Sequence, residues 1–256
     1  MQNTIRSSKL CLSIPLLQQI WLIERPASLE ELWNRLANEA DCAGATGKGR
    51  RRLKNALEIE LDELVQDFDE DERIPYWTEV WPAGIGLAEW LLCAPLKNKL
   101  CLELGCGLGL SALAGVAAGG KVVAMDYEPL ALYYTAKNSR LNIARTKGSS
   151  GNLYCLAADW RNICFKSGAF DRIWAGDIMY ERRFMRPIAR LVNHCLKPTG
   201  KVWIAEPGRG IYPEFVGIMR ESGWRASIIA RRKARLPDTD AAPADIQIWE
   251  LVRNKF

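Results

Sequence analysis

Short apolar stretches alternate with longer amphipathic stretches in the second part of the chain, from about residue 99 onward. Apolar runs bounded by glycine and polar residues are typical of buried strands, and apolar residues at helical spacing are typical of helices. The helical pattern is clearest at Pro129–Leu141 and Arg182–Cys195. Seven strands are predicted, at Lys99–Leu104, Lys121–Met125, Leu153–Ala157, Phe170–Ala175, Lys201–Ala205, Arg225–Ala230 and Asp245–Val252.

The alternation of these strands with helices predicts the class of fold. Strands that are apolar along almost their whole length are typical of a parallel sheet that helices cover on both faces. The last two strands are joined by the loop Lys233–Ala244 without a helix, which indicates an antiparallel pair. We therefore expect an α/β fold: a Rossmann-like, doubly wound, mostly parallel seven-stranded sheet with an antiparallel terminal hairpin.

The chain before residue 75 has a different pattern. Ser28 and Glu31 have the spacing of a capping box, and the apolar residues from Leu29 to Leu36 recur at helical spacing. Glycines at 44, 47 and 49 then interrupt the chain as a linker would. We expect residues 1–56 to form an N-terminal helical extension and linker, and residues 57–256 to form the sheet-containing domain.

Composition narrows the class of protein further. The chain has one histidine, His194, and its cysteines form no C-x-x-C pair, so neither a metal site nor a secreted disulfide framework is expected. No apolar run approaches the roughly 20 residues of a membrane helix. These features predict a cytoplasmic protein with reduced thiols and no bound metal or membrane partner. The cysteines are Cys11, Cys42, Cys93, Cys101, Cys106, Cys155, Cys164 and Cys195.

The charge of the chain is only mildly positive, at +5. A basic tract at Lys48–Lys54 could contact nucleic acid, but an acidic stretch at Glu58–Glu72 follows it at once. A solvated linker face explains the basic tract more simply. We expect a monomer without a nucleic-acid partner.

A glycine-rich turn between the first predicted strand and its helix is the strongest chemical motif. The segment Leu102–Leu110 reads LELGCGLGL, with Gly105, Gly107 and Gly109 at alternate positions. Such a turn lets a ligand approach the backbone at a helix N-terminus. The dinucleotide fingerprint G-x-G-x-x-G, started at Gly105, would need a third glycine at the position of Leu110. Started at Gly107, the pattern still leaves an NAD site possible.

Glu103 favours a different cofactor. It lies within the strand just before the turn, where its carboxylate would repel a pyrophosphate. S-adenosylmethionine instead presents a cationic amino group and a sulfonium. The pattern E-x-G-x-G-x-G therefore predicts an S-adenosylmethionine site.

Acidic residues also end the next two predicted strands. Asp126 follows the glycine turn by about twenty residues, a position from which an acid can accept both ribose hydroxyls. Asp159 follows the third strand and could accept from the adenine amine, and Trp160 could stack on the ring. With Glu103 and Asp177, these acids are expected at the carboxyl-end edge of the sheet, where ligands bind in open α/β folds.

Four segments together resemble the seven-β-strand protein lysine methyltransferases, in the branch that modifies the electron-transfer flavoprotein β subunit. The resemblance covers about residues 57–252. The glycine turn is common to class I methyltransferases, whereas the tryptophan-rich segment and the D-x-x-Y are more specific to this family. The segments are Pro75–Gly84 (PYWTEVWPAG), Leu102–Leu110, Gly176–Tyr180 (GDIMY) and Glu206–Arg209 (EPGR).

The resemblance implies roles for individual residues. The D-x-x-[YF] motif falls on Asp177 and Tyr180, which would be catalytic beside the methyl donor at the mouth of a lysine channel. Trp81 would lie against the cofactor. The sequence also allows Asp177 to be a helix N-cap near Glu181, and Arg209 either to contact an acidic part of the substrate or to lie in a plain loop.

The implied function is therefore methyl transfer from S-adenosylmethionine to a lysine side chain of a protein substrate. Two alternatives stay open at this point: a small-molecule N- or O-methyltransferase on the same fold, and a non-catalytic module that binds S-adenosylmethionine.

Overall fold

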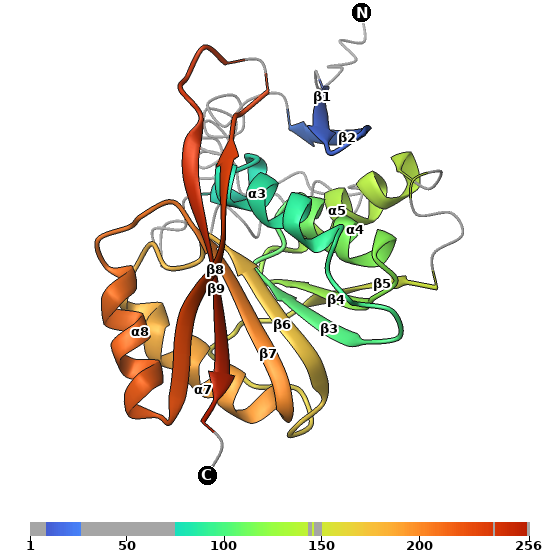
Figure 1. Ribbon diagram of the computed structural model, residues 1–256. Coiled ribbons are helices and arrows are strands. Elements are labelled where there is room, and N and C mark those ends of the chain that lie inside the picture. The colour runs from blue at the N-terminus through green and yellow to red at the C-terminus, as the bar shows by residue number, and fades with distance from the viewer. Residues whose placement is uncertain (1–8, 27–74, 143–144, 146–149, 238, 255–256) are drawn as a thin grey trace, which may run out of the picture.

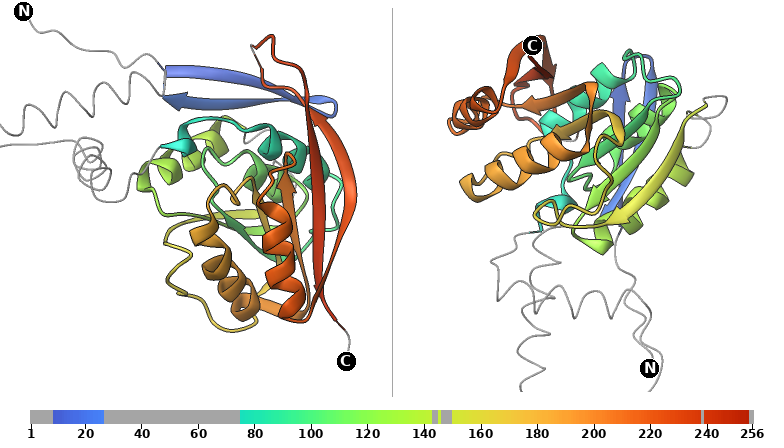
Figure 2. Two further views of the ribbon diagram at one scale, coloured as in Figure 1. Left: turned by 90° about the vertical axis from the view of Figure 1, so that its left-hand side faces the viewer. Right: turned by 90° about the horizontal axis from the view of Figure 1, so that it is seen from below.

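A computed structural model describes residues 9–26, 75–142, 145, 150–237 and 239–254. Within these ranges the chain forms a central sheet with helices on both faces, and a separate two-stranded hairpin lies outside one layer of helices (Figures 1 and 2). No helix within these ranges is long and apolar enough to cross a membrane. The predicted capping box at Ser28, the glycine linker and the charged tracts between residues 48 and 72 lie outside the described residues.

The sheet has seven strands in the order β5-β4-β3-β6-β7-β9-β8. Neighbouring strands from β5 to β7 are parallel, whereas β9 is antiparallel to both β7 and β8. This confirms the predicted parallel sheet with its antiparallel terminal hairpin. The strands are β3 (Leu100–Leu104), β4 (Lys121–Asp126), β5 (Asn152–Ala157), β6 (Phe170–Gly176), β7 (Leu196–Glu206), β8 (Trp224–Ala234) and β9 (Ala244–Arg253).

Helices cover both faces of the sheet because successive strand side chains point in opposite directions. In β6, Trp174 packs into the core on the side of α3, α4 and α5, whereas its neighbours Ile173 and Ala175 pack into the core on the side of α7 and α8 (Figure 1). A strand in the middle of the sheet, such as β6, therefore needs apolar residues on both of its faces. The helices are α3 (Pro82–Leu91), α4 (Leu110–Ala117), α5 (Pro129–Leu141), α7 (Met185–Cys195) and α8 (Tyr212–Glu221), with 3-10 turns η1 (Tyr76–Thr78) and η2 (Arg182–Phe184).

The N-terminal extension is not helical where the structure describes it. Residues 9–26 form an antiparallel hairpin of β1 (Lys9–Leu16) and β2 (Gln19–Pro26). Leu12, Ile14 and Leu16 are buried and the residues between them are exposed, which is the period of a strand with one buried face. The expectation of a helical extension is therefore wrong for this segment, because its apolar residues alternate at a spacing of two.

The hairpin packs on the outer side of the helical layer that contains α3 and α5 (Figure 2). Its buried residues, including Trp21 and Ile23, belong to the same core cluster as α3, α4 and α5. The division of the chain at residue 56 stays a prediction, since residues 27–74 lie outside the described ranges.

Candidate functional site

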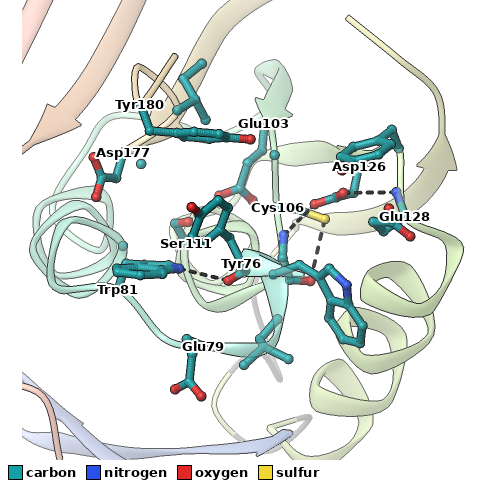
Figure 3. A pocket seen from close by; sticks show the side chains of 18 of the residues that line it. Tyr76, Glu79, Trp81, Glu103, Cys106, Ser111, Asp126, Glu128, Asp177 and Tyr180 are labelled. Carbon is teal, nitrogen blue, oxygen red and sulfur yellow. Dashed lines mark hydrogen bonds between the residues drawn. The ribbon is translucent and has the colours of Figure 1, made fainter. Parts of the chain in front are cut away.

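A pocket of about 600 Å³ opens at the carboxyl ends of β3, β4 and β6. Its lining includes Glu103 from the end of β3, Asp126 from the end of β4 and Asp177 directly after β6. Because β3 lies between β4 and β6 in the sheet, Glu103 lies between the other two acids (Figure 3). The strand order thus brings together three of the four predicted acids.

The glycine turn forms the floor of the pocket in the conformation that its sequence predicts. Gly105, Gly107 and Gly109 all line the pocket and have φ values of 64°, 51° and 85°. Residues with side chains rarely adopt this left-handed region. At Gly109, a β-carbon would also lie 2.7 Å from the side chain of Thr135. The turn needs glycine for its backbone conformation and for close packing against α5.

Glu103 is a buried acid with one oxygen unpaired. Glu103 is 1% exposed, and the Ser111 hydroxyl donates a hydrogen bond to Oε1. The Trp174 indole and the Ala112 backbone N–H also lie near the carboxyl, but among the described residues no donor makes a well-formed hydrogen bond to Oε2. Burial raises the pKa of this carboxyl from its ordinary 4.5 to about 8. A buried acceptor without a donor is costly, so a cationic ligand that donates to Oε2 would relieve the cost.

Asp126 braces the turn from the neighbouring strand. Its Oδ2 accepts the backbone N–H of Gly107 at 2.9 Å, and its Oδ1 accepts the backbone N–H of Glu128 at 3.1 Å. Burial raises the pKa of Asp126 above its ordinary value. Each carboxylate oxygen can accept a further hydrogen bond, so these contacts leave the predicted role toward ribose hydroxyls possible.

The two residues predicted after β5 lie in different surroundings. Trp160 lines the pocket and is 8% exposed, and its ring lies against the position of Gly105. Asp159 is not among the pocket-lining residues, and its Oδ2 lies 2.6 Å from Nε of Arg161. The structure therefore brings Trp160 into the site, whereas Asp159 is paired outside it.

A row of aromatic rings connects Trp81 to Trp160 along the pocket. Neighbouring ring centroids are 6.0 Å apart for Trp81 and Tyr76, 5.3 Å for Tyr76 and Tyr180, 5.6 Å for Tyr180 and Phe184, and 5.1 Å for Phe184 and Trp160. The outer rings of Tyr76 and Trp81 are each 38% exposed. Trp90 packs instead on Trp203 with centroids 4.4 Å apart, as expected of a core residue. The aromatic row thus reaches solvent at one end only, beside Asp177 (Figure 3).

Asp177 is held by an arginine from the next strand end. Its backbone is left-handed, with φ at 57°, and its side chain is 6% exposed. Arg209 donates to both carboxylate oxygens, through Nε to Oδ1 and through Nη2 to Oδ2 at 2.8 Å. The N-cap of the following 3-10 turn is Glu181, without a side-chain capping bond. The alternative that Asp177 is a helix cap is therefore wrong.

Sequence reasoning missed several lining residues. Ser111 is the second residue of α4, from where its hydroxyl reaches Glu103. Tyr76 lies within the tryptophan-rich segment, and its ring packs between those of Trp81 and Tyr180. Glu128 is the N-cap residue of α5 and is buried close to Asp126, to which its backbone N–H donates. The spacing of Ser111 from the glycine turn was a usable signal, whereas the contacts of Tyr76 depend on the tertiary fold.

The donor set fits a cationic nucleoside ligand. An unpaired buried carboxylate at Glu103 suits an amino group, the left-handed glycine turn exposes backbone at a helix N-terminus, and Trp160 offers a ring face. A pyrophosphate in the same place would be repelled by the negative charge of Glu103. The fold and the site together define a class I, Rossmann-like methyltransferase domain rather than an NAD-binding one.

Comparison with known proteins gives the family. A family model described as lysine methyltransferase matches residues 61–212, which is more than half of the chain. The chain belongs to this lysine methyltransferase family.

Individual relatives agree with this assignment. Electron transfer flavoprotein beta subunit lysine methyltransferase from Danio rerio is 32% identical to this chain, over 55% of this chain and 53% of that protein. The protein of the same name from Xenopus laevis is 30% identical, over 53% of this chain and 53% of that protein. The chain therefore spans about half the length of these curated relatives. Magnesium protoporphyrin IX methyltransferase from Synechocystis PCC 6803 shares the fold, with a TM-score of 0.50 and 14% identity over 89% of this chain and 92% of that one.

Proposed function

We propose that the protein transfers a methyl group from S-adenosylmethionine to the side-chain amine of a lysine in another protein. The observation that carries the proposal is a single pocket with an unpaired buried carboxylate, Glu103, at its centre and the D-x-x-Y pair, Asp177 and Tyr180, at its open end. Membership of the lysine methyltransferase family supports it. The relatives named for the electron transfer flavoprotein beta subunit make that subunit the first acceptor to try.

The donor would be held by the inner part of the pocket. Glu103 would accept from the amino group, Asp126 from the ribose hydroxyls, and the turn of Gly105, Gly107 and Gly109 would pack against the ligand. Trp160 would stack on the adenine ring, and Trp81 would lie on the outer side of the donor. Asp159 does not line the pocket in this structure, so its side chain would have to turn from Arg161 toward the pocket to accept from the adenine amine.

The donor supplies an activated methyl group on a sulfonium, so the protein has to place an unprotonated amine in line with it. Asp177 can accept a hydrogen bond from the amine and aim its lone pair. Burial raises the pKa of the Tyr180 hydroxyl, so Tyr180 stays neutral and forms a wall of the channel without adding charge. The exposed rings of Tyr76 and Trp81 leave the acceptor end open to a protruding side chain.

A transfer experiment separates this function from the small-molecule alternative. Labelled S-adenosylmethionine is incubated with the purified protein and a native cell extract, and label is counted in the protein and small-molecule fractions. We expect label on a discrete protein band, and we expect an Asp177→Ala variant not to produce this labelled band. Label confined to small molecules would overturn the proposal that a protein lysine is the acceptor. Binding of S-adenosylhomocysteine without any methyl transfer would favour a non-catalytic module.

We also propose a cytoplasmic monomer that acts on a protein without binding nucleic acid. The cysteines support this setting, because those within the described residues are free thiols: Cys11, Cys93, Cys101, Cys106, Cys155, Cys164 and Cys195.

A further inference from the structure

Asp177 is neutralised by a cation that the fold delivers from a different strand. Arg209 donates to both of its carboxylate oxygens, and this geometry is the strongest that an arginine–carboxylate pair can adopt. The Asp177 side chain is 6% exposed and that of Arg209 is 37% exposed. The pair therefore lies where the pocket meets solvent, and water screens it less than a surface pair.

The position of Arg209 is itself fixed. The buried Glu206 carboxylate at the end of β7 accepts the backbone N–H groups of Gly208 and Arg209 at 2.6 and 2.9 Å. On its other oxygen, Glu206 accepts Nε1 of Trp249 from β9 at 3.3 Å. Gly208 adopts a φ of 89°, which allows the sharp turn. The loop is thus organised to present one guanidinium to Asp177.

Asp177 does not depend on Arg209 for its backbone position. Its N–H donates to the carbonyl of Ala205 at 2.9 Å, and this bond ties the end of β6 to β7. A substitution at Arg209 should therefore change the charge around the carboxylate more than its location. This separation makes the contribution of Arg209 measurable.

The other charged groups on this side of the pocket are already paired. Glu79 pairs with Arg25 from the N-terminal hairpin, and Glu181 pairs with Arg183 at 2.6 Å. Among the described lining residues, Arg183 and Arg209 are the cations. Glu103 shares a hydrogen bond with Ser111, and Tyr76 and Tyr180 supply rings. Arg209 is thus the cation that faces Asp177, with Glu206 behind it.

We propose that Arg209 is a positioning residue that offsets the charge of Asp177, so that the acceptor lysine occupies the site as the neutral amine. The inference rests on the proposed function and deepens it. An unpaired carboxylate would bind a lysine ammonium tightly and hold its proton, which would block attack on the methyl group. With the guanidinium in place, Asp177 still accepts a hydrogen bond through its remaining lone pairs but favours the ammonium far less.

The physical expectation concerns the pH dependence of turnover. A free lysine has a pKa of about 10.4. A carboxylate beside an ammonium raises its pKa, and a neighbouring guanidinium opposes this rise. Removal of the guanidinium should therefore move the rising limb of kcat to higher pH, by about one unit or more. Below this limb, one unit corresponds to about a tenfold loss of kcat.

The test compares Arg209→Gln, Arg209→Lys and Asp177→Asn with the wild type, on purified electron transfer flavoprotein beta subunit and labelled S-adenosylmethionine. For Arg209→Gln we expect an upward shift of the kcat limb and near-normal turnover at high pH. Arg209→Lys keeps the charge and should restore most of the wild-type limb. Asp177→Asn should lower the plateau without raising the limb, because it removes the orienting acceptor.

Two controls separate this role from a structural one. Arg182→Gln removes an exposed arginine paired with Glu214 outside the pocket lining and should leave the profile unchanged. A double-substitution cycle of Arg209→Gln and Asp177→Asn, followed by urea unfolding, should show that the two changes are strongly non-additive. This second measurement needs no turnover.

The outcomes are distinguishable. If the wild type transfers methyl groups and the pH dependence of kcat is the same in Arg209→Gln, the charge role of Arg209 is overturned and the proposed function stands. Strict additivity in the cycle would show that the two side chains are not paired in solution and would also overturn it. Failure of the wild type to methylate either this acceptor or any protein in an extract would overturn the proposed function itself, and the role of Arg209 with it.

Discussion

At the scale of single residues, burial determines how Glu103 behaves. Its pKa is raised from 4.5 to about 8, so folding takes up a proton between these two values and stability falls as pH rises through that window. At neutral pH the buried Glu103 carboxyl thus lowers the free energy of unfolding relative to an uncharged side chain. Such groups are typical of binding sites.

Glu103→Gln should therefore stabilise the protein while it weakens the donor site. Gln resembles the neutral acid, so we expect the free energy of unfolding at pH 7 to rise by about 3 kcal/mol, with no gain below pH 4.5. Binding of S-adenosylhomocysteine should fall at least tenfold. Urea unfolding across pH and titration calorimetry measure the two effects. Unchanged binding in the variant would remove Glu103 from the donor site.

Gly109 gives a second prediction at this scale. Gly109→Ala places a methyl group 2.7 Å from Thr135 on a backbone with φ at 85°. We expect a loss of stability of about 2 kcal/mol or more, with weaker binding of S-adenosylhomocysteine. Gly217→Ala in α8 is the matched control, because nothing lies within 4 Å of its β-carbon position and alanine favours a helix. Equal stability of the two variants would contradict this account of the turn.

The acidic residues at the centre of the site could be predicted from the sequence because they lie at strand ends. Glu103, Asp126 and Asp177 each follow or end an apolar run, and parallel strands bring these ends to one edge. The pairing of Asp177 with Arg209 could not be predicted in the same way. It depends on the neighbouring position of β6 and β7 and on the turn after Glu206, which residue patterns alone do not specify.

At the scale of elements, the N-terminal hairpin is attached to α5 by two fully buried asparagines. Asn142 bonds both backbone groups of Leu22, at 3.0 and 2.7 Å, and Asn138 bonds both backbone groups of Glu24, at 2.8 and 3.0 Å. The side-chain amides thus act as a neighbouring strand for the free edge of β2. Asn138 also donates to the carbonyl of Leu108 in the glycine turn at 2.9 Å.

This geometry predicts that two similar substitutions differ in one respect. Asn138→Ala and Asn142→Ala should each destabilise the protein by about 2–4 kcal/mol, because each leaves buried backbone groups without partners. Only Asn138→Ala should also weaken binding of S-adenosylhomocysteine, since it releases the turn at Leu108. Thermal unfolding and calorimetry test this pair. Equal binding by both variants would show that the hydrogen bond from Asn138 to Leu108 does not support the donor site.

The sequence indicated the hairpin but the signal was easy to misjudge. Leu12, Ile14 and Leu16 alternate with exposed residues, yet Pro15 interrupts the run and argues against a strand. Proline is tolerated at this position because, among the described strands, β1 pairs with β2 alone and its other edge needs no N–H donor. The helices α5 and α7 and the strands of the sheet were predicted more reliably, because their periodic segments are longer or bounded by clear turns.

At the scale of the whole molecule, the order of strands connects fold and function. Crossover connections place β3 between β4 and β6, which sets Glu103 between Asp126, proposed to bind the ribose, and Asp177, proposed to face the acceptor. The antiparallel β9 then lies beside β7 and supplies Trp249 to the turn that carries Arg209. The sheet therefore arranges the residues proposed to bind donor and acceptor along one edge, and β9 supports the turn that carries Arg209.

The most direct test of the central claim is to identify the residue that receives the methyl group. The protein is incubated with a native extract and S-adenosylmethionine carrying a deuterated methyl group, and the extract proteins are then analysed by peptide mass spectrometry. We predict deuterated methyl groups on lysine side chains of one or a few proteins, and their loss with Asp177→Ala. Deuterated methyl groups only on other residues, or none on any protein despite donor binding, would contradict a protein-lysine methyltransferase.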